Sequence, residues 1–307
     1  MNFTLHQLKI LLTVAHYQSI TKAADALLLT QPAVSLQLKK LQDQFSIPLT
    51  EVIGRKVYVT DFGAEIVKAA QKILEEVEAI SYQTHAFKNQ LAGKLQISIA
   101  STGKYVMPYY LAGFMELHKG VDLVMDVTNK TLVVNSLEKN EVDFALVSVV
   151  PEQLQTNRVT LLENKLFLVG SPRIRSVKKK AISAIFEEYP LLFREPGSAT
   201  RNAMENFIRE YQLPVVKKIE LTSNEALKQA LIAGLGYSIV PLIGIKNALE
   251  SKELEIIPFK GLPIVSEWNL IWLKAKKLSP VAQAYLDYLV REKAAITERQ
   301  FGWCEGY

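Results

Sequence analysis

The chain has 307 residues, of which 49% are hydrophobic and 22% charged, a composition that supports two or more domains with buried cores. No apolar run approaches the roughly 18 uncharged residues of a membrane span, and the N-terminus lacks a secretory signal, so we expect a cytoplasmic protein with no membrane partner. The single cysteine, Cys304, and four scattered histidines lack metal-ligand spacing. We therefore expect no metal and no cofactor. The net charge of +5 is compatible with an anionic partner but does not require one.

Three short helices are predicted at the N-terminus. Apolar residues recur at helical spacing from Leu5 to Ala15, and Thr21 offers an N-cap for a second helix that runs through Leu27. A third helix is expected after Thr30, because Pro32 suits a first turn and an apolar stripe runs from Val34 to Phe45.

A hairpin and a long helix follow. The segment 55–60 alternates like a strand, and Gly54 suits the tip of a short hairpin, which predicts a wing. After Gly63, apolar residues spaced by threes and fours run from Ile66 to Ile80 and continue weakly to Leu91. Such a stripe favours a partner helix, either in a second subunit or within the same chain.

From Lys94 onward, short apolar strands alternate with helices in βαβ order, which predicts two similar α/β lobes. The first-lobe strands are expected at 95–100, 123–127 and 144–149, with helices at 106–118 and 132–139. Second-lobe strands are expected at 166–169, 191–193 and 219–221, with helices at 202–211 and 226–233. A strand at 268–272 and a helix at 280–292 are expected to return to the first lobe.

Two N-terminal motifs are specific. The run Ser19-Ile20-Thr21-Lys22-Ala23-Ala24, followed by Leu29-Thr30-Gln31-Pro32-Ala33-Val34-Ser35, resembles the helix-turn-helix of LysR-type transcriptional regulators. The similarity continues through Leu41, Gly54-Arg55 and Val59-Thr60, and less specifically over the remainder. The sequence departs from the family pattern at Leu36, Thr50 and Val52, which puts part of the base readout in doubt.

The resemblance implies an α/β fold class with an all-α winged helix-turn-helix domain and a two-lobed effector domain like that of periplasmic binding proteins. It places the winged helix-turn-helix at 1–62 and a linker helix for dimerisation at 63–92. Lobe I would comprise 93–163 and 268–295, lobe II would comprise 164–267, and 296–307 would form a C-terminal tail.

The third helix carries the candidate DNA contacts. Val34, Leu38 and Leu41 are needed for the core, which leaves polar side chains for base edges and phosphates. In the wing, Arg55 matches an arginine of the family and can reach a phosphate or the minor groove. The alternatives are a small helical subdomain without DNA and, for the two lysines, a solvated face. The candidate DNA-binding residues are Thr30, Gln31, Pro32, Ser35, Gln37, Lys39, Lys40 and Arg55.

Two strand-to-helix turns carry the candidate effector site. Ser101-Thr102-Gly103 and Gly197-Ser198-Ala199-Thr200-Arg201 combine hydroxyls with helix N-termini, which favour an anion, and Arg201 adds a charged fork. Residues 194–201 also resemble an effector-site stretch of the family. Ordinary N-capping is the alternative for either turn. The candidate effector-binding residues are Ser101, Thr102, Gly103, Thr128, Asn129, Ser148, Ser198, Thr200 and Arg201.

These features predict a sequence-specific regulator of transcription that binds double-stranded DNA at an operator with an imperfect inverted repeat. It would act as a homodimer or homotetramer under the control of a small anionic effector. The alternative is a two-lobed solute-binding protein, which leaves the first sixty residues unexplained. An enzyme is not expected, because the sequence has no Gly-x-Ser-x-Gly, HExxH or P-loop, and Gly234-Leu235-Gly236 lacks the third glycine of a dinucleotide site.

Overall fold

The computed structural model describes residues 2–54, 56–86, 91–174 and 184–307. The chain divides into two compact units, Met1–Gln90 and Leu91–Tyr307. Among the described residues, no helix has the length and apolar character to cross a membrane, and no group of His, Cys, Asp and Glu could hold a metal ion.

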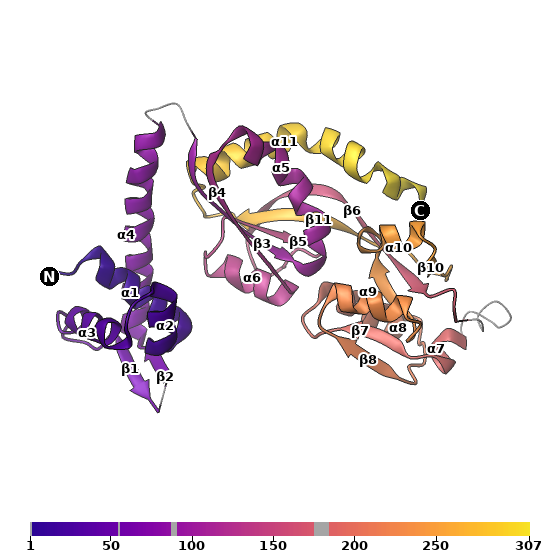
Figure 1. Cartoon of the computed structure of the whole chain (residues 1–307), viewed down its shortest axis with the longest axis horizontal. Helices are drawn as coiled ribbons and strands as arrows, with labels where there is room; N and C mark the ends of the chain where they lie inside the picture. The colour runs from indigo at the N-terminus through magenta and orange to yellow at the C-terminus, as the bar shows by residue number, and fades with distance from the viewer. Residues whose placement is uncertain (1, 55, 87–90, 175–183) are drawn as a thin grey trace. The chain divides into compact units, whose positions relative to one another are not determined.

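The first unit is a winged helix-turn-helix, as predicted (Figure 1). The helices share an apolar core to which Leu11, Val34 and Leu41 each contribute a fully buried side chain. Ser19, rather than Thr21, caps the second helix, because that helix already begins at Ile20 and the Ser19 side chain accepts a hydrogen bond from the Lys22 amide. Gly54 makes the hairpin turn at a positive φ of 66°. The elements are α1 (Leu5–Tyr17), α2 (Ile20–Leu27), α3 (Gln31–Gln42), β1 (Thr50–Ile53) and β2 (Lys56–Val59).

The long helix α4 (Asp61–Ala86) begins after the Thr60 hydroxyl, which accepts a hydrogen bond from the Gly63 amide. Its first turns pack on the helix-turn-helix core through Ile66, Val67, Ala70 and Leu74. Ile73, Val77 and Ile80 lie outside this core and are 39%, 36% and 64% exposed. Since these three residues recur at helical spacing, they form an apolar strip on α4 that the first unit leaves uncovered.

Lobe I of the second unit is built on parallel strands. β3 pairs with β4 on one side and with β5 on the other, and α5 and α11 (Pro280–Phe301) contribute to its main core through residues such as Phe114 and Tyr285. The elements are β3 (Ala92–Ala100), η1 (Ser101–Tyr105), α5 (Met107–Leu117), β4 (Gly120–Thr128), α6 (Lys130–Glu138) and β5 (Phe144–Val147).

Two long antiparallel strands, β6 (Thr156–Gly170) and β11 (Ile264–Leu273), run from one lobe into the other (Figure 1). β11 pairs with β5 in lobe I, and β6 pairs with β9 (Ser238–Pro241) and β10 (Glu255–Ile256) in lobe II. The strand order is β10-β6-β11-β5-β3-β4. The expected lobe boundaries at 163/164 and 267/268 therefore fall inside continuous strands.

Lobe II packs its helices on β7, β8 and the far ends of the crossing strands, around two apolar clusters. Gly236 leads into β9 at a φ of 157°, and a side chain there would overlap the carbonyl oxygen of Pro190. The remaining elements are α7 (Ala184–Glu188), β7 (Leu191–Arg194), α8 (Ala199–Glu210), β8 (Lys218–Leu221), α9 (Asn224–Ile232), η3 (Leu242–Gly244) and α10 (Lys246–Glu250).

The C-terminal segment contacts both lobes. Helix α11 (Pro280–Phe301) continues past Glu292, where we expected it to end, and η4 (Gly302–Gly306) follows. Phe301 is 4% exposed and stacks on Tyr110 of lobe I with ring centroids 5.8 Å apart. Trp303 packs against a lobe II cluster, where the Lys246 ammonium lies 4.9 Å from its ring centroid. Residues 296–307, expected as a tail, thus belong to a packed helical segment.

Candidate functional site

A small cavity lies between the two lobes, beside the crossing strands. Lobe I contributes the end of β3, the start of η1 and the start of α6, and lobe II contributes the end of β7 and the start of α8. Its volume is about 20 Å³, space for about one water molecule. The lining residues are Ala100, Ser101, Thr102, Asn129, Lys130, Ser148, Asn164, Arg194, Ser198, Ala199, Thr200, Pro241 and Trp268.

The N-terminus of α8 faces this cavity without a side-chain cap. Ser198 occupies the N-cap position, but its hydroxyl accepts no hydrogen bond from the first turn of the helix. Helix α6 differs, because Asn129 caps it through a hydrogen bond of 3.0 Å from the Leu132 amide. The free amides and the positive end of α8 therefore favour an anion in the cavity.

Three buried side chains that line this cavity carry polar atoms without a hydrogen-bond partner. Arg194, Asn164 and Trp268 are 2%, 5% and 2% exposed, and all three line it. Among the described residues, Arg194 Nη1, Trp268 Nε1 and Asn164 Oδ1 have no hydrogen-bond partner. A buried polar atom without a partner costs free energy, so these three side chains are suited to bind a polar group that enters the cavity.

Two cationic side chains, Arg194 and Lys130, line the cavity. The Arg194 guanidinium binds both carboxylate oxygens of Glu195 at 2.8 Å, through Nε and Nη2, which orients the remaining nitrogen. Burial lowers the pKa of the Lys130 ammonium, and the Glu152 carboxylate acts in the opposite direction. A small anion would offset this cost of desolvation by pairing with the Lys130 ammonium and the Arg194 guanidinium.

The structure brings together most of the predicted effector residues. The predicted residues that line the cavity are Ser101, Thr102, Asn129, Ser148, Ser198 and Thr200. Gly103 and Thr128 do not line it: Gly103 is buried, where a side chain would press on Leu146, and Thr128 pairs with Ala100 in the sheet. Binding of an effector by any of these residues stays a prediction.

Arg201 does not line the cavity either. Its guanidinium binds Glu205 at 2.9 Å, Glu220 at 2.6 Å and the Arg194 carbonyl oxygen at 2.9 Å. The hydrogen bond to Glu220 is the main cause of a raised pKa at Arg201. The guanidinium at the cavity is that of Arg194, which begins the stretch 194–201 that resembles the family's effector site but was not among the candidate residues. Arg194 stands at the end of β7, where ligands of α/β sheets bind.

The small cavity adjoins a larger groove of about 650 Å³. The groove runs between α8 and the crossing strands, past Asn206 and Tyr211. Residues that line both spaces are Lys130, Ser148, Asn164, Ala199 and Thr200. A ligand thus has a path to the polar groups of the small cavity.

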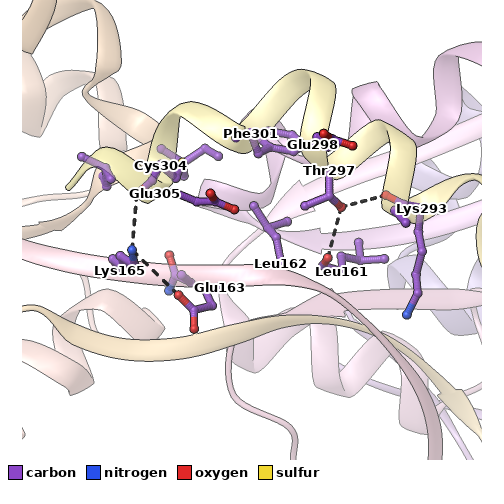
Figure 2. Close-up of a pocket in the computed structure, with 15 residues that line it drawn as sticks. Leu161, Leu162, Glu163, Lys165, Lys293, Thr297, Glu298, Phe301, Cys304 and Glu305 are labelled. Atoms are coloured by element: carbon purple, nitrogen blue, oxygen red, sulfur yellow. Dashed lines mark hydrogen bonds and ion pairs between the residues drawn. The ribbon is translucent and has the colours of Figure 1, made fainter.

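A separate cavity of about 580 Å³ lies between β6, η3 and the C-terminal segment (Figure 2). Its two cations already have main-chain partners: Lys165 Nζ donates to the carbonyl oxygens of Cys304 and Tyr307, and Lys293 Nζ donates to that of Thr160. Burial raises the pKa of the Cys304 thiol at its wall to about 11. This cavity is therefore less suited to bind an anion than the cavity between the lobes.

Helix α3 presents a polar face opposite its buried one. Val34, Leu38 and Leu41 are at most 6% exposed and pack inward. Thr30 takes the N-cap position without using its hydroxyl as a cap. The exposed candidates on the helix and at its start are Thr30, Gln31, Pro32, Ser35, Lys39 and Lys40.

The Gln37 side chain is partly buried and accepts a hydrogen bond of 3.2 Å from Gln7 of α1, which leaves its amide nitrogen for other contacts. Arg55 lies outside the described residues. Val52 on β1, where the family usually has arginine, is 66% exposed.

Comparisons with known proteins match both units. Residues 5–64 match the family model described as "Bacterial regulatory helix-turn-helix protein, lysR family", and residues 88–294 match the "LysR substrate binding domain". The RuBisCO operon transcriptional regulator of Allochromatium vinosum is 35% identical over 96% of this chain and 98% of its own. The transcriptional activator CmpR of Synechocystis is 35% identical over 97% of this chain and 99% of its own.

A solved structure of the regulatory domain of Synechocystis CcmR in complex with 2-PG is also similar, with 31% identity and a TM-score of 0.61. The match covers 66% of this chain and 97% of that one. The family models together account for both units of the fold, and the family consists of DNA-binding regulators of transcription rather than enzymes. The chain belongs to the LysR family of transcriptional regulators.

Proposed function

We propose that this regulator holds a small anion in the space formed by the cavity between the lobes and the groove that adjoins it, and that the anion controls how a homodimer or homotetramer binds its operator. The observation that carries the proposal is that Arg194, whose Nη1 has no partner, the uncapped N-terminus of α8 and several side chains with hydroxyls all line one cavity. One helix end is worth about 0.3 to 1 kcal/mol to an anion, so useful affinity requires these groups to act together.

The candidate anion is a small phosphate or carboxylate. The CcmR regulatory domain, 31% identical, was solved with 2-PG, which makes 2-PG the first compound to test. A solute receptor without a role at DNA is not supported, because the N-terminal unit matches the helix-turn-helix of the family.

The uncovered strip of Ile73, Val77 and Ile80 supports dimerisation through α4. A two-fold dimer presents two copies of α3, which is how helix-turn-helix proteins read inverted repeats. Gln31, Ser35 and Lys39 recur at four-residue spacing and would face the major groove together.

Calorimetry on the full chain tests the anion site. A panel of small phosphates and carboxylates that includes 2-PG should contain a binder, and Thr200→Val should weaken that binder by about 1.5 to 3 kcal/mol, the value of a hydrogen bond to a charged group. Thr222→Val, the same change at an exposed site outside the cavity, is the matched control. A binder that is neutral or cationic, or one that Thr200→Val leaves unchanged, would contradict the proposal.

We propose further that the operator precedes a RuBisCO operon, because the relative from Allochromatium vinosum carries that function in its name. Sequencing the genomic fragments that the purified protein captures tests this. Fragments that cluster elsewhere would contradict the target and leave the anion site untouched.

A further inference from the structure

A hydrogen-bonded contact joins the two lobes beside the cavity. Asn224 is the first residue of α9 in lobe II, and its Nδ2 donates to Ser101 Oγ at 3.0 Å and to Thr102 Oγ1 at 3.2 Å, both in η1 of lobe I. The preceding residue, Ser223, already caps α9 by accepting from the Ala226 amide. The Asn224 side chain is therefore not needed as a cap.

This contact determines whether the two hydroxyls donate or accept hydrogen bonds toward the cavity. A hydroxyl has one proton to donate and lone pairs to accept with. Ser101 and Thr102 each accept from Asn224, and in the described part of the chain neither hydroxyl donates to another residue. Both line the cavity and are left with a free proton.

We propose that Asn224 is a positioning residue that makes Ser101 and Thr102 hydrogen-bond donors toward the effector. The proposal rests on the anion site described above and adds a cause for its selectivity. Hydroxyls held as donors suit a ligand that presents acceptors, such as a phosphate or carboxylate, and disfavour a ligand that must donate to them.

The contact would also give the anion a higher affinity for one arrangement of the lobes than for another. The amide that orients the hydroxyls comes from lobe II and the hydroxyls come from lobe I. The oriented donors therefore exist only while the lobes hold this arrangement. A ligand shifts an equilibrium between two states only through a difference in affinity for them, and Asn224 supplies such a difference.

Two substitutions at neighbouring positions test the proposal in the full chain, with 2-PG and inorganic phosphate as probes. Asn224→Asp keeps the side-chain shape but replaces the donor by a carboxylate that accepts from both hydroxyls. Ser223→Asp adds the same charge one residue away and keeps an N-cap residue on α9. We expect Asn224→Asp to weaken probe binding by about tenfold or more relative to Ser223→Asp, with thermal unfolding of both variants measured to confirm folding.

A double-mutant cycle separates orientation from a structural effect. If Asn224 acts through the hydroxyls, the extra loss from Asn224→Asp should disappear in a background that carries Ser101→Ala and Thr102→Val. Equal losses in Asn224→Asp and Ser223→Asp, or an extra loss that persists without the hydroxyls, would overturn the role of Asn224. Binding of a probe by the wild-type protein would still support the anion site. Failure of the wild-type protein to bind either probe or any other small anion would overturn the anion site as well.

Discussion

The contrast between Arg194 and Arg201 gives a sharp test of the anion site. Arg194 is 2% exposed, uses Nε and Nη2 to bind Glu195, and keeps Nη1 at the cavity. Lysine at this position has a single nitrogen, so it cannot pair with Glu195 and also reach the place that Nη1 occupies. We expect Arg194→Lys to weaken binding of the anion.

The magnitude follows from the bond that is lost. A hydrogen bond between charged groups contributes about 1.5 to 3 kcal/mol, so the dissociation constant should rise about 10- to 150-fold. Arg201→Lys should change it less than about threefold, because the Arg201 guanidinium is held by Glu205, Glu220 and the Arg194 carbonyl outside the cavity. Its ion pairs are partly exposed and each contributes about 0.2 to 1 kcal/mol to folding.

Isothermal calorimetry with the best anion of the panel measures both variants at one ionic strength. Denaturant unfolding of each variant shows that the folded fraction is unchanged under the conditions of binding. If Arg201→Lys weakens binding of the anion as much as Arg194→Lys does, the assignment of the Arg194 guanidinium to the anion site is wrong.

The other predictions concern the first unit. Val77→Asp places a charge on the uncovered strip of α4 and should turn a dimer into monomers in light scattering, whereas a wild-type monomer at micromolar concentration would contradict dimerisation. Gln31→Ala should reduce operator affinity by about 1 to 3 kcal/mol more than affinity for random DNA. Lys39→Ala should reduce both equally, as a phosphate contact does, and equal losses for the two variants would remove Gln31 from base readout. Gly63→Ala should lower the denaturation midpoint, because its new methyl group would overlap the Leu49 carbonyl oxygen; an unchanged midpoint would contradict this packing.

Local patterns were enough to predict the first unit. The apolar stripe of α3 and the glycine of the hairpin are short-range signals that act within one or two turns of chain. The cap of α2 was misplaced by two residues, because Ser19 and Thr21 both have the chemistry of a cap and the decision depends on where the helix begins.

The site was harder to predict, because it depends on contacts between distant residues. Glu205 lies four residues after Arg201, which is a visible signal for an ion pair on a helix. Glu220, on a different strand, gives no such signal. The bond from Asn224 to Ser101 joins residues 123 positions apart, and no local pattern could have indicated it.

Control of DNA binding by an anion between the lobes can be measured on the full chain. The most direct measurement is operator affinity by fluorescence anisotropy with and without the anion, at constant ionic strength because DNA binding itself depends strongly on salt. We expect the anion to shift the operator dissociation constant of the wild-type protein, the shift to require a higher anion concentration for Thr200→Val, and Thr222→Val to behave as wild type. An anion that binds by calorimetry yet leaves the affinity for the operator and the stoichiometry of the complex unchanged would contradict such control.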